Sequence, residues 1–369
     1  MPPAPAAVAD SFDEHTPSCL LLNAAGVTLR RLREVAGEAG VPPVAVLPGP
    51  LAFTPGERQR VLALRSTGFV ERESAEVRRR GLAVLHPFRA AYPPLLRQIP
   101  DPPLCLYAEG DAARLSDPAV AVVGSRNATM YGRSAAEAVA GQLALAGLTV
   151  TSGFARGIDA AAHHGAARGG GATVAVLGCG ADVPYPRGHE GLRAEIRAHG
   201  CVVTEFPLGT RPTKTSFPQR NRIISGLSLG TVVIEARDRS GALITARHAL
   251  EQGREVFAVP GSIFAPSSAG PHRLIKDGAK LVEHVDDILA EIQAQLPPPG
   301  EGFRPASPAL LPAGSVEARV FGALGKEPLH VDELAARLGL AMPALMPALS
   351  LLELRRCARA HPGKFFSRP

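Results

Sequence analysis

The chain has 369 residues, of which 46% are hydrophobic and 20% charged, and its formal net charge is +6. This length predicts two or three domains, and so modest a charge means that local clusters of cations must carry any argument for a polyanionic partner. No apolar run approaches 18 residues, the N-terminus has no signal-peptide pattern, and the five cysteines include no C-x-x-C pair. We therefore expect a cytoplasmic protein without membrane contact, metal site, disulfide or cofactor.

The N-terminal third divides into three segments. Residues 1–16 are rich in proline and alanine, which predicts a disordered tail. Residues 17–82 are predicted to form a small helical domain. Within it, Thr54-Pro55-Gly56-Glu57 has the pattern of a helix start, with an N-cap threonine, a first-turn proline and a capping-box glutamate. Residues 83–110 are rich in proline and are predicted to be an extended adaptor.

Residues 111–292 alternate short apolar runs with alanine-rich helical stretches. This alternation predicts a Rossmann-like, doubly wound and mostly parallel sheet with helices on both faces. Ligands of such sheets bind at the carboxyl ends of the strands. The predicted strands are Ala119–Val123, Leu148–Thr151, Thr173–Leu177, Cys201–Thr204, Thr231–Ile234, Glu255–Val259 and Lys280–Val282.

The C-terminal part begins with a proline-rich stretch, residues 293–314, that is predicted to be a linker. In residues 315–369 two apolar helical faces are separated by Gly339, which is the spacing of a helix–turn–helix. A hairpin near residues 359–366 would complete a winged helix. A three-helix packing module without DNA contact is an equally good interpretation of this part.

The segment Arg211–Arg222 holds four cations, one aromatic ring and no acid. Cations neutralise phosphates, and an aromatic ring offers a surface on which an unpaired base can stack, so this segment suits single-stranded nucleic acid. Its two prolines predict a stiff loop. The alternative is a solvated basic loop whose ring belongs to the core. The cations and the ring are Arg211, Lys214, Arg220, Arg222 and Phe217.

Three turns rich in glycine and serine follow predicted strands. They are Gly124-Ser125-Arg126, the Ser152-Gly153 turn that continues to Arg156, and Ser240-Gly241. Backbone N–H groups at such strand-to-helix turns bind anions, and an arginine fork suits phosphate oxygens. The turns match neither the dinucleotide fingerprint nor a P-loop. Together with the basic segment they predict a groove lined with hydrogen-bond donors.

Evidence for catalysis is sparse. His163 and His164 are adjacent, which is the wrong spacing for a metal pair, and we expect them at the surface or in a helix cap. Asp159 and Glu235 could form a carboxylate pair, but we expect Asp159 to orient its turn and Glu235 to lie beside Arg237 or Arg222. A rival interpretation is a nucleotide hydrolase of the lysine-decarboxylase-like type, because residues 226–235 keep a Gly-Thr pair and a glutamate of that motif.

Several motifs, in order, resemble the DNA-processing protein A family (DprA, also called Smf). They are V-V-G-S-R, S-G-F-A-R-G-I-D-A-A-A-H, L-G-C-G-A-D-V-P-Y-P, F-P-Q-R-N-R-I-I-S-G-L-S, S-G-A-L-I-T-A and V-F-A-V-P-G-S, and they cover about residues 80–290. The helical N-terminus and the C-terminal module resemble that family's sterile-alpha-motif-like and winged-helix domains by placement. The resemblance implies a protein without known chemistry. It would bind single-stranded DNA, help to load the RecA recombinase onto it, and protect incoming DNA in natural transformation.

The resemblance and the turns together give the predicted sites. The last strand would be an exposed apolar edge, and the resemblance implies a homodimer through it. The predicted dimer residues are Leu274, Ile275, Leu281 and Val282. The predicted DNA-binding residues are Gly124, Ser125, Arg126, Ser152, Gly153, Arg156, Lys214, Phe217, Arg220, Asn221, Arg222, Ser240 and Gly241.

Overall fold

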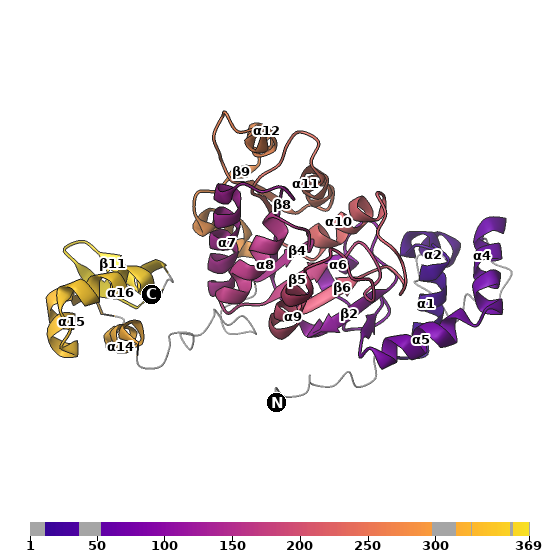
Figure 1. Cartoon of the computed structure of the whole chain (residues 1–369), viewed down its shortest axis with the longest axis horizontal. Helices are drawn as coiled ribbons and strands as arrows, with labels where there is room; N and C mark the ends of the chain where they lie inside the picture. Colours follow the sequence, from indigo (N-terminus) through magenta and orange to yellow (C-terminus); the bar gives the residue numbers. More distant parts are fainter. Residues whose placement is uncertain (1–11, 37–52, 297–314, 326, 355–356, 369) are drawn as a thin grey trace. The chain divides into compact units, whose positions relative to one another are not determined.

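The computed structural model describes residues 12–36, 53–296, 315–325, 327–354 and 357–368 (Figure 1). These residues form two compact units that divide between Leu296 and Pro297. Most of the predicted tail (1–16) and linker (293–314) lies outside the described residues. None of the helices described is long and apolar enough to cross a bilayer.

The first unit begins with a small bundle of helices. Thr54 and Glu57 form the predicted capping box: the Thr54 side chain accepts from the Glu57 N–H, and the Glu57 side chain accepts from the Thr54 N–H. The bundle packs against the sheet, because its core includes Tyr107, and Asn23 donates to the Glu205 carbonyl at 2.8 Å. The helices are α1 (Thr16–Ala24), α2 (Leu29–Ala36), α4 (Pro55–Ser66) and α5 (Phe69–Arg79).

A nine-stranded sheet follows, in the order β1-β2-β6-β5-β4-β3-β7-β8-β9. The seven predicted strands correspond to β3–β9, each end within one residue of its prediction. The strands are β1 (Ala83–Leu85), β2 (Leu106–Gly110), β3 (Ala119–Val123), β4 (Thr149–Ser152), β5 (Thr173–Val176), β6 (Cys201–Thr204), β7 (Gly230–Val233), β8 (Glu255–Ala258) and β9 (Lys280–Leu281).

The strands β3–β9 are mutually parallel, and β1 and β2 add to them in antiparallel fashion. Both added strands come from the proline-rich segment 83–110. The sequence predicts this segment to be extended but does not reveal its pairing, because each strand is short and prolines lie between the two. The helix α6 (Pro94–Arg97) and a 3₁₀ turn (Ala112–Ser116) complete this region.

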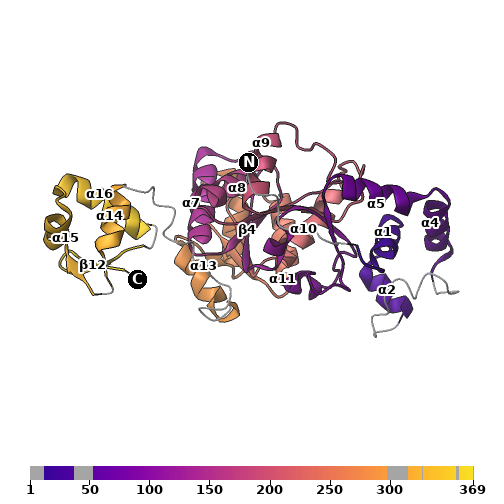
Figure 2. The same ribbon diagram turned by 90° about the horizontal axis from the view of Figure 1, so that it is seen from below.

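Helices cover both faces of the sheet, as predicted. The chain moves from β3 to β6 in one direction and from β7 to β9 in the other, so right-handed crossovers place the two sets of helices on opposite faces. Figure 2 shows α8 and α9 on one side and α10 and α11 on the other. The helices are α7 (Met130–Leu145), α8 (Ile158–Arg168), α9 (Glu190–His199), α10 (Ser216–Gly226), α11 (Gly241–Glu251), α12 (Ala269–Lys276) and α13 (Val285–Ile292).

The basic segment differs from its prediction. Residues from Ser216 onward form α10, so the predicted stiff loop is limited to the stretch before it. Pro218 is tolerated because it lies in the first turn, where its missing N–H has no helical acceptor. As a result, Phe217 and the two arginines of this segment point in directions fixed by a helix packed on the sheet.

The second unit is a winged helix. It contains α14 (Val316–Ala323), α15 (Val331–Leu338), α16 (Met342–Leu354) and a three-stranded sheet in the order β10-β12-β11 (Leu329–His330, Phe365–Ser367, Arg359–His361). The predicted apolar faces meet in its core. The exposed residues among the described side chains of α16 include Ala344, Met346 and Pro347 and no cation.

Candidate nucleic-acid interface

The candidate site lies where the strand order reverses. The strands β3 and β7 are neighbours, with Val120 opposite Gly230 and Val123 opposite Val233, and the chain leaves them toward opposite faces. A crevice therefore forms beyond their carboxyl ends, which is where open α/β sheets bind ligands. The Gly124–Arg126 turn follows β3 directly, and the turn that leads to Ser240 follows β7.

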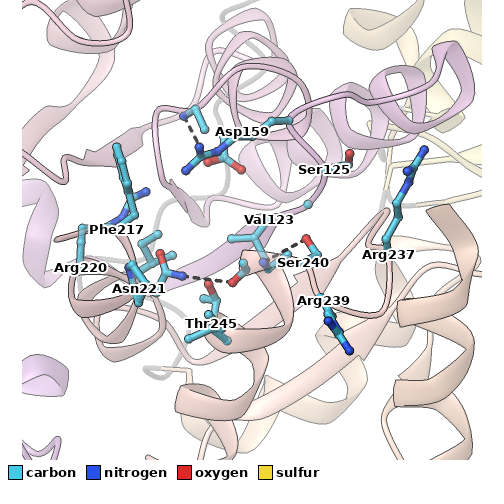
Figure 3. Close-up of a pocket in the computed structure, with 18 of the residues that line it drawn as sticks. Val123, Ser125, Asp159, Phe217, Arg220, Asn221, Arg237, Arg239, Ser240 and Thr245 are labelled. Atoms are coloured by element: carbon cyan, nitrogen blue, oxygen red, sulfur yellow. Dashed lines mark hydrogen bonds between the residues drawn. The ribbon is translucent and has the colours of Figure 1, made fainter. Parts of the chain in front are cut away.

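This crevice, hereafter the basic groove, has a volume of about 670 Å³. In Figure 3, Phe217 and Arg220 lie on one side of it and Arg237 and Arg239 on the other. The only acid among its lining residues is Asp159, which is buried. Its lining residues include Gly124, Ser125, Arg126, Lys214, Phe217, Arg220, Asn221, Arg237, Arg239, Ser240 and Gly241.

The turn after β3 is held by the turn after β4. Ile158 donates its N–H to the Ser125 carbonyl at 3.1 Å. Gly157 has φ +82°, and a side chain there would overlap the backbone oxygens of Ser125 and Arg126, so glycine is required. Gly124 and Ser125 are half-buried and the Arg126 side chain is exposed, which leaves its guanidinium free to meet a phosphate.

The start of α10 positions Lys214 and Phe217. Thr213 and Ser216 exchange backbone-to-hydroxyl hydrogen bonds of 3.0 Å, and Ser216 also donates to the Gly178 carbonyl at 2.6 Å. This anchored turn holds Lys214 at the surface of the groove. Phe217 is half-buried: Arg126 lies over its ring and Tyr185 packs against it with ring centres 5.5 Å apart. The alternative that Phe217 is a core residue is therefore only partly right.

Arg220 lines the groove, but it is only 4% exposed. Its guanidinium donates to the carbonyl of Gly153 at 2.5 Å and to that of Val176, so it ties the ends of β4 and β5 to α10. Burial lowers its pKa to about 10, which keeps it charged at neutral pH, and the buried Asp159 carboxylate opposes that shift. Arg220 therefore holds the turns after β4 and β5 in place, and its positive charge adds to the electrostatic potential of the groove.

Arg222 does not reach the groove, and its predicted role as a phosphate ligand is wrong. Its guanidinium forms a two-pronged ion pair with Glu205, at 2.8 and 2.7 Å, and a further contact with Asp101 at 3.2 Å. It is 9% exposed. Burial raises the pKa of Glu205, and Arg222 opposes that shift. Arg222 thus stabilises the packing of α10 rather than the site.

The turn before α11 forms the far side of the groove. The Ser240 hydroxyl accepts from the Ala242 N–H at 3.3 Å as the helix N-cap. Asn221 donates to the Gly241 carbonyl at 3.1 Å, which joins α10 to this turn. Arg237 and Arg239 are exposed here and add two cations that the predicted set omitted. The sequence signal for these two cations was the run Arg237-Asp238-Arg239, in which the negative charge of Asp238 offsets one of the two positive charges.

A second hollow of about 500 Å³ adjoins the groove and shares Arg126, Phe217 and Arg220 with it. Arg156, Tyr185 and Arg187 line it, and all three are exposed. Gly153 also lines it. Ser152 does not: it is fully buried and its hydroxyl donates to the Val122 carbonyl at 2.6 Å, so its predicted contact with DNA is replaced by a bond inside the sheet.

The acids considered for catalysis have structural partners. Asp159 accepts from the Ala155 N–H at 3.2 Å, so it orients its turn as expected, and burial raises its pKa. Glu235 is 3% exposed and accepts from both the N–H and the hydroxyl of Thr129, at 2.9 and 2.5 Å. It therefore holds the start of α7, rather than lying beside Arg237 or Arg222. No metal-binding group of three or more side chains exists among the described residues.

Two further predictions concern histidines and the sheet edge. His163 is fully buried and contacts the Thr173 hydroxyl at 2.7 Å, so its predicted surface position is wrong.

The strand β9 is the edge strand, as expected, and Leu281 is 38% exposed. Leu274 and Ile275 are half-buried on the adjacent helix α12. Val282 is 2% exposed and donates to the Ala258 carbonyl, so its side chain belongs to the core of this chain and not to a free surface.

Comparison with known proteins gives consistent matches. The family model of DNA recombination-mediator protein A matches residues 83–293, and a DprA winged helix domain model matches residues 304–364. Protein Smf of Escherichia coli is 44% identical over 281 residues, which are 74% of each chain. DNA processing protein DprA of Streptococcus pneumoniae is 46% identical over 202 residues, which are 55% of this chain and 71% of its own.

Two solved structures are similar. The X-ray structure of DprA from Streptococcus pneumoniae superposes with a TM-score of 0.64 at 35% identity, covering 76% of this chain and 98% of its own. A Helicobacter pylori DprA structure, described as giving insight into its single-stranded DNA binding mode, superposes with a TM-score of 0.53 at 27% identity. It covers 58% of this chain and 97% of its own.

Proposed function

Because the chain belongs to the DNA recombination-mediator protein A (DprA/Smf) family, we propose that it binds single-stranded DNA in the basic groove and helps to load the RecA recombinase onto that strand. The relative from Helicobacter pylori has a described single-stranded DNA binding mode. In the cell the bound strand would be DNA taken up in natural transformation.

The observation that carries this proposal is the composition of the basic groove. Four exposed cations and an aromatic ring line the crevice between β3 and β7, and the lining holds no exposed acid. The cations neutralise the backbone, while a ring accepts any unpaired base, because every base has a flat face. The four cations are Arg126, Lys214, Arg237 and Arg239. We assign Gly124, Ser125, Asn221, Ser240 and Gly241 to the walls of the groove, and Gly153 and Arg156 to the adjoining hollow.

We propose that the protein acts by binding and not by catalysis. The rival nucleotide hydrolase would need Glu235 as an acid facing its substrate. That carboxylate is buried and already accepts from Thr129 and from the Ser267 hydroxyl at 3.2 Å. An assay of nucleotide hydrolysis with the wild type and Glu235→Gln discriminates the two: turnover that disappears in the variant would favour the enzyme.

A homodimer through the β9 edge is part of the proposal. Leu281 is exposed there, and Ile275 lies on the helix that precedes the strand. A two-fold pairing of such an edge would place two copies of the basic groove on one particle. Two grooves holding the same strand would raise the overall affinity without any new contact.

The experiment that tests the function compares one labelled sequence as a single strand and as a duplex, by fluorescence anisotropy across salt. We expect tighter binding of the single strand at every salt concentration, since only its bases can reach Phe217. Equal or tighter binding of the duplex would contradict the proposal. The isolated winged-helix unit serves as a separate sample, because its α16 carries no exposed cation among the described side chains.

A further inference from the structure

A second surface, outside the lining of the basic groove, is an apolar and exposed patch. It consists of Met130, Tyr131, Ile263 and Phe264, which are 82%, 54%, 81% and 89% exposed. Two of these residues begin α7 and two lie on the loop between β8 and α12 (Figure 1). Large side chains are seldom left this exposed together unless the surface binds something.

The patch is held as one surface by hydrogen bonds. The Tyr131 hydroxyl donates to the Pro260 carbonyl at 2.8 Å, which fixes its ring beside the loop. Glu235 accepts from Thr129 on one side and from Ser267 on the other, so the same carboxylate joins the start of α7 to the loop. The loop itself closes through the Ala265 N–H and the Ser262 carbonyl at 3.0 Å.

The segment that follows the patch residues Ile263 and Phe264 is joined to the turn that lines the basic groove. Ala236 donates its N–H to the Ser267 carbonyl at 2.7 Å and accepts from the Gly270 N–H at 2.8 Å. The next residue, Arg237, is exposed and lines the groove. A strand whose phosphates pass Arg126 and Arg237 would therefore run toward the loop that carries Ile263 and Phe264.

We propose that this patch is a second base-stacking surface for the same single strand, with Phe264 and Tyr131 as the rings and Ile263 and Met130 as apolar contacts beside them. The inference rests on the proposed function, since it extends the path of the strand from the groove. Charge and chemistry select this occupant: the neighbouring cation attracts phosphate, and rings stack on bases regardless of sequence. A second copy of the chain is the competing occupant.

The test uses a series of oligothymidylates from about 4 to about 16 nucleotides, the range of single-strand site sizes. Affinity for the shortest strands measures binding in the groove alone, and the increase in affinity with length measures the contribution of the patch. We expect Phe264→Ala to leave the shortest strands unaffected and to weaken the longest about tenfold. Ile263→Ser should act in the same direction, and a 2-aminopurine placed beyond the groove should lose its quenching in both variants.

Leu62→Ala is the matched control, because Leu62 is 57% exposed on α4, away from the patch. Equal affinity of wild type and Phe264→Ala for every length would overturn the inference while leaving groove binding intact. If the wild type binds no strand of any length, the proposed function itself is contradicted. Sedimentation equilibrium identifies the rival: if Phe264→Ala dissociates a dimer, the patch is an interface between copies and the stacking role is rejected.

Discussion

The guanidinium of Arg126 lies 4.8 Å from the centre of the Phe217 ring, so the turn after β3 and the first turn of α10 meet directly over the basic groove. A cation at this distance is attracted by the ring. It also covers part of the surface that a base would use. Phosphate binding by Arg126 and stacking on Phe217 should therefore depend on each other.

A double-mutant cycle of Arg126→Ala and Phe217→Ala tests this dependence. Each single change should weaken single-strand binding, by about 1–3 kcal/mol for Phe217, and the pair should depart from additivity by at least about 0.5 kcal/mol. Thermal melts are needed beside the titrations. Replacing a fully buried phenylalanine by alanine costs about 3–5 kcal/mol of unfolding free energy. A loss of stability this large in Phe217→Ala, with unchanged binding, would mean that Phe217 only packs.

Arg222→Ala should affect stability and not the salt dependence of DNA binding. It leaves Glu205 buried without its partner, and breaking such a pair costs about 3–5 kcal/mol of unfolding free energy. Arg168→Ala is the control, because its pair with Glu137 is exposed and is worth about 1 kcal/mol or less. A lower salt slope in Arg222→Ala at unchanged stability would return this residue to the groove.

Leu281→Arg should convert dimers into monomers that bind single strands more weakly. The edge strand β9 exposes this side chain, and a charge there opposes pairing of two edges. Light scattering at micromolar concentration measures the outcome, with Leu62→Arg as the matched change elsewhere. A monomeric wild type, or a variant that stays dimeric, is incompatible with this interface.

His163 should make the fold sensitive to acid. Burial lowers its pKa to about 3, with smaller effects from nearby positive groups, while the unfolded value is near 6.5. Between these values the unfolded chain takes up a proton that the native side chain does not. The free energy of unfolding should therefore fall as pH drops from about 6.5 toward 3, by at most about 1.4 kcal/mol per pH unit from this group. His163→Gln should flatten that fall and His164→Gln should not, as urea titrations at several pH values can measure.

Sequence patterns indicated where the strands and turns lie but not which contacts the individual side chains make. The strands β3–β8 were predictable because buried parallel strands are short continuous apolar runs. The position of the crevice was predictable because turns such as Gly124–Arg126 follow the strands directly. Which of the cations would reach the groove was not predictable from the sequence. Arg220 and Arg222 lie two residues apart in one cationic segment, yet both are buried, one on strand carbonyls and the other on Glu205.

Their partners come from β4, β5 and the end of β6, and only the packed fold brings these elements to α10. The same holds for His163, whose buried place depends on Thr173 of β5. The helical start of α10 was missed because proline counts against a helix interior but is accepted in a first turn. Local patterns therefore located the groove, and tertiary contacts decided which side chains face it.

The salt dependence of single-strand affinity in Arg126→Ala and Lys214→Ala tests the central claim most directly. Both cations are exposed at the basic groove, so each should hold a phosphate. Each change should lower the slope of log affinity against log salt by about 0.7, the value for one ion released from a single strand, with Arg65→Ala as an exposed control on α4. Weaker binding with the reduced slope in both variants is the result we predict. Wild-type slope and affinity in both would place the DNA elsewhere on the molecule.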